Sequence, residues 1–193
     1  MCGSRMGAFL AALATFRKAT AQLSTPRDAY SNRSRPVAMA ELNDDFLDMI
    51  QSLLDQEVEF LVIGAYALSV HGYVRATEDI DFWVRPSATN AQRVVAALED
   101  FGAPLATHGI STADFQVMNT VYQLGLPPRR IDLLTSVSGV SFDAASASAV
   151  EGELGGYRLR FIGRESLIAN KRATGRAKDL ADADALEALS ARY

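Results

Sequence analysis

The chain is poor in the residues that build disulfide scaffolds and zinc sites. Among its 193 residues are one cysteine, Cys2, and two histidines. A lone cysteine forms no internal disulfide, which excludes a small stapled secreted scaffold and favours a reducing, cytoplasmic location. Any bound metal is expected to rest on oxygen ligands, because few sulfur and imidazole ligands are present.

Long hydrophobic runs are absent as well. No stretch reaches the roughly 20 apolar residues that a membrane-spanning helix needs, so we expect no membrane partner. A chain of this size buries roughly 70% of its unfolded surface. That is enough for one self-sufficient core and too little for two generous domains.

Charge divides the chain into two parts. Residues 1–38 carry six basic and one acidic side chain, whereas residues 39–193 carry 13 basic and 22 acidic ones, a net charge of -9. The apolar run at 6–16 is short for an export signal and no clear cleavage site follows it. We predict that 1–38 is a basic leader, poorly ordered or not native to the protein, and that 39–193 is the folded domain.

Hydrophobic periodicity predicts alternating helices and strands from residue 41 onward, without an internal repeat. This mixed order predicts a single α/β or α+β domain. The predicted helices are 41–56, 65–70, 88–101, 141–150, 164–174 and 178–192, and the predicted strands are 60–63, 79–84, 131–134 and 157–162, with a further strand considered within 115–124.

The strand predicted at 79–84 carries two acids, Asp79 and Asp81. Residues two apart on a strand share a face, so both carboxylates point together while Ile80, Phe82 and Val84 face the core. Two carboxylates about 5 Å apart repel by roughly 3 kcal/mol at an effective dielectric of 20, which favours a cation between them. Oxygen ligands of this kind select Mg²⁺ or Mn²⁺. The alternative is an acidic edge strand whose acids are solvated.

A second strand, predicted at 131–134, contains a lone acid, Asp132. A buried carboxylate is costly unless it is paired or bound to a metal. One alternative is therefore an ion pair with Arg129 or Arg130.

Two further segments could meet phosphate groups. Gly64 and Ala65 form a strand-to-helix turn, where unpaired backbone N–H groups can face an anion, although a glycine after a strand is usually only a turn. Residues 171–178 contain four basic side chains at a helix end, which would also complement the helix dipole.

Taken together, these segments resemble the minimal nucleotidyltransferases of the DNA polymerase beta-like superfamily, which include AbiEii-type toxins. The resemblance covers residue 39 to the C-terminus. It implies the nucleotidyltransferase fold, a small mixed sheet flanked by helices in a single domain. The matching residues are Gly64-Ala65-Tyr66-Ala67, His71-Gly72, Arg75, Thr77, Asp79-Ile80-Asp81, Arg130-Ile131-Asp132 and the segment from Lys171 to Asp179.

The resemblance also implies a role for each site residue. Asp79 and Asp81 would bind the metal ions, Mg²⁺ or Mn²⁺, and Asp132 would complete one metal site and help to deprotonate the acceptor hydroxyl. A second set would contact the nucleoside triphosphate, with Arg75 and Thr77 either positioning the nucleotide or bracing a loop. The members of this second set are Gly64, Ala65, Arg75, Thr77, Lys171 and Arg176.

The implied reaction moves a nucleoside monophosphate from a nucleoside triphosphate to an acceptor hydroxyl and releases pyrophosphate. A tRNA acceptor is one possibility, as in toxin relatives with a cognate antitoxin, because basic residues gather at 158–178. A small molecule resembling an aminoglycoside or lincosamide is another, since a domain of charge -9 is a poor general nucleic-acid binder. A non-catalytic nucleotide-binding or partner-binding module is a third. It draws support from Ala65, which stands where the family usually has glycine or serine.

Overall fold

A computed structural model describes residues 42–126 and 129–190 of the chain. The predicted basic leader, residues 1–38, lies outside the described residues. Within the described ranges, none of the helices has the length and apolar character needed to cross a membrane.

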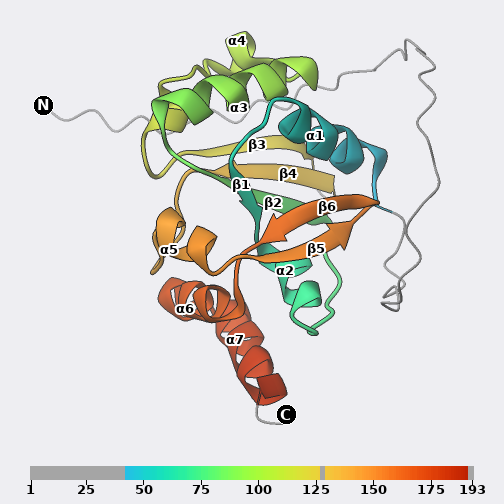
Figure 1. The fold of residues 1–193 in the computed structure, drawn as a ribbon, viewed down its shortest axis with the longest axis vertical. Coiled ribbons are helices and arrows are strands. Elements are labelled where there is room, and N and C mark those ends of the chain that lie inside the picture. Colours follow the sequence, from blue (N-terminus) through green and yellow to red (C-terminus); the bar gives the residue numbers. More distant parts are fainter. Residues whose placement is uncertain (1–41, 127–128, 191–193) are drawn as a thin grey trace, which may run out of the picture. The chain divides into compact units, whose positions relative to one another are not determined.

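A six-stranded mixed sheet forms the centre of the domain, in the order β3-β4-β2-β1-β6-β5 (Figure 1). Two pairs of neighbours are parallel, β2 with β4 and β1 with β6, and the other neighbours are antiparallel. The strands are β1 (Phe60–Val62), β2 (Asp79–Val84), β3 (Val121–Leu126), β4 (Arg129–Leu134), β5 (Val150–Leu154) and β6 (Tyr157–Phe161).

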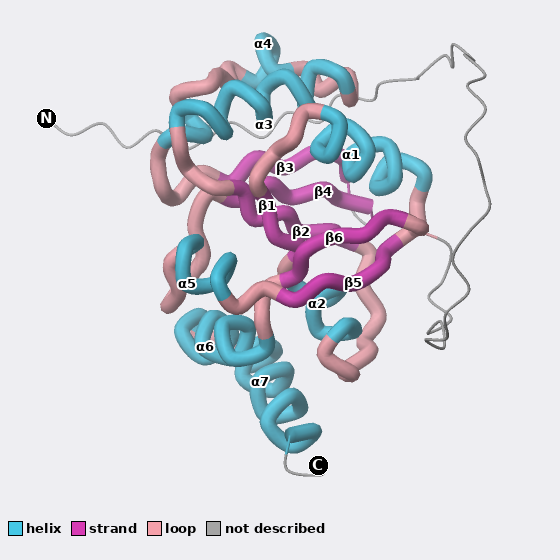
Figure 2. The backbone as a smooth tube through the Cα atoms, in the orientation of Figure 1, coloured by secondary structure: helices cyan, strands magenta, loops and turns pink. Residues whose placement is uncertain are grey.

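Helices cover both faces of this sheet, as the tube in Figure 2 shows. Several begin at a capping side chain: Ser87 accepts a hydrogen bond from the backbone of Asn90, and Ser141 from that of Ala144. The helices are α1 (Asp44–Asp55), α2 (Gly64–Val70), α3 (Ala88–Asp100), α4 (Leu105–His108), α5 (Phe142–Ala147), α6 (Arg164–Thr174) and α7 (Ala177–Ser190), with a 3-10 turn η1 (Asp114–Gln116).

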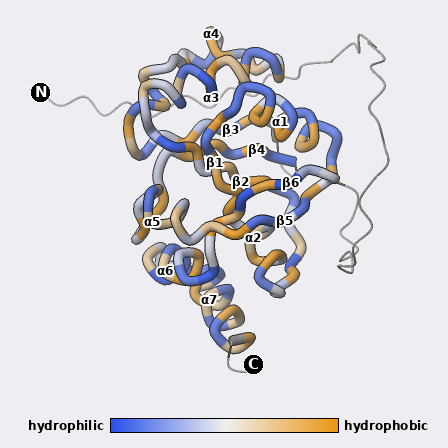
Figure 3. The backbone as a smooth tube through the Cα atoms, in the orientation of Figure 1, coloured by the Kyte–Doolittle hydropathy of each residue, from blue (hydrophilic) through white to orange (hydrophobic). Residues whose placement is uncertain are grey.

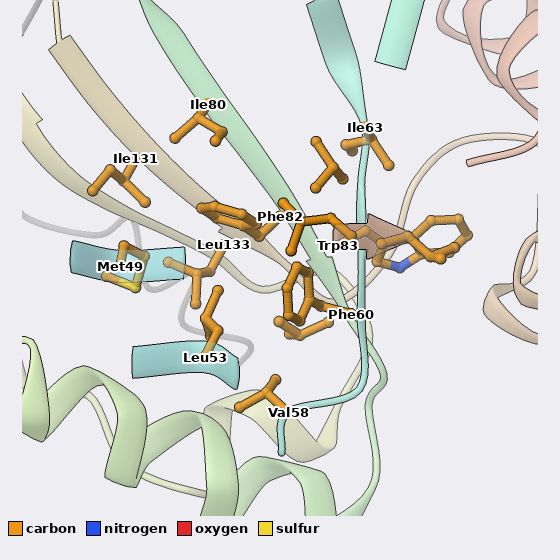
Figure 4. Packing of buried hydrophobic residues seen from close by; sticks show 14 of the residues in the cluster. Met49, Leu53, Val58, Phe60, Ile63, Ile80, Phe82, Trp83, Ile131 and Leu133 are labelled. Carbon is orange, nitrogen blue, oxygen red and sulfur yellow. The ribbon is translucent and has the colours of Figure 1, made fainter. Parts of the chain in front are cut away.

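The hydrophobic core lies between the sheet and α1. Ile80 and Phe82 of β2 point to this side, together with Leu133 of β4, and all three are fully buried (Figure 4). Met49 and Leu53 of α1 pack against them. The amphipathic character of α1 and α3, with hydrophilic and hydrophobic turns side by side in Figure 3, matches this one-sided burial.

The opposite face of the sheet is only partly apolar. Trp83 of β2 is buried there against Phe142 of α5, the two rings meeting edge to face at 5.2 Å between centroids. Asp79 and Asp81 share that face, because alternate residues of β2 point to alternate sides. The helices α2, α5, α6 and α7 belong to this side (Figure 1). The burial of Ile80, Phe82 and Val84 confirms the predicted orientation of the strand.

Most of the predicted elements are found, and the exceptions have a physical reason. The helix predicted to run to Val150 ends at Ala147, and Val150 instead begins β5 as the partner of Phe161 in β6. Alanine-rich composition favoured a longer helix, but pairing with a neighbouring strand overrides local preference. Neither β5 nor the short α4 was predicted.

Candidate active site

Three carboxylates come together on the polar face of the sheet. Asp79 and Asp81 lie two residues apart on β2, and Asp132 lies on β4. The parallel pairing of these strands places Asp81 directly opposite Asp132. Facing residues of neighbouring strands project to the same side, so all three acids lie on one face. The expected convergence of Asp132 with the other two acids is therefore found.

The glycine at the start of α2 makes room for one of these acids. Gly64 has a left-handed backbone, with φ of +66°, and a Cβ built on it would overlap Oδ2 of Asp81. The preceding residue, Ile63, donates its backbone N–H to the carbonyl of Asp81 at 3.1 Å. Only glycine combines this conformation with such a close approach. Gly64 thus leaves room for the Asp81 carboxylate at the beginning of α2.

Asp81 is costly to ionise in this site. Burial is the largest cause, and repulsion from Asp132 and Asp79 adds to it, so that the pKa of Asp81 rises from 3.8 to about 6. The positive charges of Lys171 and Arg130 act in the opposite direction. Burial and the neighbouring carboxylates thus both disfavour the ionised form of Asp81, and a cation bound beside it would favour that form.

An arginine next to Asp132 supplies part of the compensation. Arg130 donates from Nε to Asp132 Oδ1 at 2.7 Å and from Nη2 to Asp132 Oδ2 at 3.0 Å. The same Nη2 lies 3.3 Å from Asp79 Oδ2. Gln123 of β3 donates to both oxygens of Asp132 at 3.3 and 3.2 Å. Of the two arginines considered from the sequence, Arg130 is the partner, and Arg129 is exposed.

The chemistry of this donor set fits a divalent ion. The three acids offer only oxygen ligands, as Mg²⁺ and Mn²⁺ prefer, and such an ion would stabilise the ionised form of Asp81, whose pKa is raised by burial and then by repulsion. As the side chains lie, however, no group of three His, Cys, Asp or Glu residues in the described ranges has the arrangement of a metal site. Instead, the Arg130 guanidinium contacts Asp79 and Asp132.

A buried ion-pair network joins α6 and α7 beside the acids. Lys171 is 7% exposed, and its Nζ lies 2.6 Å from Asp179 Oδ1 and 3.1 Å from Asp182 Oδ2. Arg75, from the segment before β2, reaches Asp182 at 3.3 Å. Burial opposes ionisation of Asp179, but hydrogen bonds from Lys171 and Thr174 outweigh it and hold the pKa of that carboxyl below its usual value. The network holds the two helices together.

The other residues predicted to contact nucleotide have local partners too. Thr77 donates its hydroxyl to the Asp79 carbonyl at 3.0 Å, which braces the start of β2. Arg176 pairs with Asp179 at 2.6 Å, yet its side chain is 75% exposed. Ala65 is buried in the first turn of α2. Lys171, Arg75, Thr77 and Arg176 are thus all engaged within the protein.

A family model matches the described part of the chain. A family model described as "Nucleotidyl transferase of unknown function", DUF2204, matches residues 42–192. The chain belongs to this family. It is a nucleotidyltransferase, and enzymes of this class generally use divalent metal ions. AbiEii-type membership is not part of that finding.

A solved structure is similar at a greater distance. It is the crystal structure of a "putative nucleotidyltransferase" from Thermotoga maritima, with 10% sequence identity and a TM-score of 0.43. The similarity covers 77% of this chain and 94% of that chain. No curated protein matches this chain.

Two side chains at the site were not singled out from the sequence. Asp182 is 2% exposed and ion-paired to Arg75 and Lys171, and Gln123 contacts Asp132 from the neighbouring strand. Asp182 follows Asp179 by three residues, a helical spacing that places both acids on one face of α7. That spacing was an available signal for Asp182. Gln123 had none, because only the pairing of β3 with β4 brings it to Asp132.

Gly64→Ala tests the close packing of Asp81. Gly109→Ala is a matched control, because Gly109 has the same φ of +66° with nothing within 4 Å of a built Cβ. The control should lose roughly 1–2 kcal/mol from left-handed strain alone. Gly64→Ala should lose about 1–3 kcal/mol more, because the methyl group displaces Asp81. Urea unfolding measures both variants, and equal losses would contradict the packing argument.

Asp81→Asn tests the cost of ionising Asp81, which burial and then repulsion from Asp132 and Asp79 impose. Because the pKa of Asp81 is raised on folding, the folded chain binds more protons between pH 3.8 and about 6, and stability falls as pH rises through that range. The amide stays neutral, so the metal-free variant should be more stable than the wild type at neutral pH. The expected gain is about 1–3 kcal/mol, since the side chain is partly exposed.

Chemical unfolding in the presence of a chelator measures this gain. It should vanish below pH 3.8, where the wild-type carboxyl is protonated in both states. Asp48→Asn, on the exposed side of α1, is the control and should change little at either pH. A neutral-pH stability of Asp81→Asn below that of the wild type would contradict a net cost of ionising Asp81 in the folded protein.

Proposed function

We propose that this nucleotidyltransferase is metal-dependent and moves a nucleoside monophosphate from a nucleoside triphosphate to an acceptor hydroxyl, releasing pyrophosphate. The observation that carries this proposal is the convergence of Asp79, Asp81 and Asp132 on one face of two parallel strands. Three acids gathered where burial and, after it, mutual repulsion raise the pKa of Asp81 favour a function that needs them together.

In the proposed mechanism, Asp79 and Asp81 would hold Mg²⁺ or Mn²⁺, and Asp132 would complete the ligand set. When bound, the metal would supply charge stabilisation at the α-phosphate and at the leaving pyrophosphate. A carboxylate oxygen of Asp132 accepts the proton of the acceptor hydroxyl as the new oxygen–phosphorus bond forms. The bond between the α- and β-phosphates breaks, and pyrophosphate leaves with the displaced electron pair.

The residues proposed to bind nucleotide divide by exposure. Arg176 is the exposed cation and would contact the triphosphate directly, exchanging part of its contact with Asp179 for phosphate oxygens. Lys171 is buried, and it would act through its field, which already lowers the pKa of Asp81. Arg75 and Thr77 would brace the segment before β2. Gly64 and Ala65 would support the phosphates at the start of α2, where Ala65 leaves little exposed surface.

The charges at 158–178 favour a small-molecule acceptor over RNA. Arg158 forms an ion pair with Glu151, and Arg172 forms ion pairs with Asp184 and Glu187. Arg160 donates a hydrogen bond to the carbonyl of Ser146. Nucleic-acid binding depends on basic side chains that neutralise phosphates. The three arginines just named already have partners within the protein. A cationic small molecule with a free hydroxyl suits the acidic face better. A tRNA end, with a toxin-like role and a cognate antitoxin, is the second candidate, because the same segment concentrates basic residues.

Asp81→Asn tests the proposed chemistry. Labelled triphosphates of each base are incubated with Mn²⁺ and either a tRNA pool or a panel of aminoglycosides and lincosamides, and label transfer and pyrophosphate release are measured. Loss of a metal ligand should reduce transfer at least about a hundredfold. Glu78→Gln, an exposed neighbour, is the control and should retain transfer. Undiminished transfer by Asp81→Asn would refute its role, and tight triphosphate binding without any release by the wild type would favour a non-catalytic module.

Salt dependence distinguishes the two acceptor classes. At fixed Mg²⁺, raising KCl from about 50 to 200 mM costs an RNA acceptor with six or more phosphate contacts about a thousandfold in affinity. We expect label on the cationic small molecules, with less than about a tenfold change over this range. Label on tRNA, falling steeply with salt and weakened further by Lys178→Gln, would instead identify an RNA acceptor.

A further inference from the structure

Arg130 lies where it can neutralise two of the three acids at once. Its guanidinium donates hydrogen bonds to both oxygens of Asp132, from Nε at 2.7 Å and from Nη2 at 3.0 Å. The same Nη2 lies 3.3 Å from Oδ2 of Asp79. A guanidinium is protonated throughout the ordinary pH range, so Arg130 holds a full positive charge against these two carboxylates.

The other cation at the site has its contacts elsewhere. Lys171 lies within contact distance of Asp179 and Asp182, and it influences Asp81 only through its field. Among the described residues, Arg130 is therefore the one cation that contacts members of the acid group through hydrogen bonds or ion pairs. A bidentate contact between a guanidinium and a carboxylate is among the stronger charge-assisted hydrogen-bonding arrangements.

We propose that Arg130 is the resident counter-ion of the metal site and competes with the divalent ion for Asp132 and Asp79. This inference rests on the proposed metal dependence. An oxygen of Asp132 that accepts from Arg130 is less available to a metal, so the guanidinium must withdraw as the ion binds. The arginine side chain is 30% exposed, so a path to solvent exists for it.

The neighbouring glutamine allows this exchange without loss of the site. Gln123 also donates to both oxygens of Asp132, at 3.3 and 3.2 Å, and keeps the carboxylate oriented when Arg130 withdraws. Arg130 thus stabilises the metal-free protein while it lowers the affinity for metal. A purely structural arginine would stabilise both forms equally.

Calorimetric titration of Mn²⁺ into chelator-treated protein tests the proposal. Arg130→Gln should bind Mn²⁺ at least about tenfold more tightly than the wild type, because a unit charge within a few ångströms of the ion has been removed. Arg129→Gln is the matched control. It removes the same charge from the preceding residue of β4, whose side chain is exposed. Arg130→Lys keeps the positive charge but loses the bidentate contact with Asp132. Its Mn²⁺ affinity should lie between those of Arg130→Gln and Arg129→Gln.

Thermal unfolding with and without Mn²⁺ gives a second readout, independent of activity. Metal-free Arg130→Gln should melt below the wild type, since Asp132 loses its partner, and Mn²⁺ should raise its melting temperature more than that of the wild type. Should Arg130→Gln not fold without metal, Arg130→Lys, compared with Arg129→Gln, makes the same comparison. Mn²⁺ affinities of the Arg130 variants equal to or weaker than that of Arg129→Gln would overturn the competition.

The outcomes separate this inference from the proposed function. If the wild type binds Mn²⁺ and transfers nucleotide but the Arg130 variants gain no affinity, only the role of Arg130 fails. If neither the wild type nor any Arg130 variant binds Mn²⁺, the metal dependence fails and the inference with it. Binding by Arg130→Gln alone supports the competition directly.

Discussion

The gathering of three carboxylates on one face of a sheet is the constraint around which this domain is organised. The parallel pairing of β2 and β4 sets Asp81 opposite Asp132, with Asp79 two residues away. On the other face, the same strands bury Ile80, Phe82 and Leu133 against α1. Hydrophobic burial on that side holds the strands in register and thereby holds the acids together in spite of their repulsion.

Compensation for this charge comes from two cations that differ in burial. Lys171 is buried between Asp179 and Asp182, and its field lowers the pKa of Asp81 without direct contact. Arg130 contacts Asp79 and Asp132 directly and is partly exposed. In our proposal, Lys171 is therefore a permanent counter-charge, and Arg130 is one that a divalent ion can replace.

The same ion pairing bears on the acceptor. Basic side chains that are grouped in the sequence are distributed in the structure among separate carboxylates, such as Arg158 with Glu151 and Arg172 with Asp184. A run of positive charge in a sequence is thus no measure of a positive surface. Family membership establishes the nucleotidyl transfer class, and the cationic acceptor is our proposal.

The sequence alone determined which strand carries the paired acids and which side they face, because alternation along 79–84 has only one solution with Ile80 and Phe82 buried. It also marked Asp132, a lone acid in an apolar strand. Only the tertiary structure decided that Arg130 rather than Arg129 pairs with Asp132, that Gly64 lies against Asp81, and that Val150 belongs to β5. Each of these depends on which strands and helices become neighbours, and local periodicity carries no information about contacts between segments that are far apart in the chain.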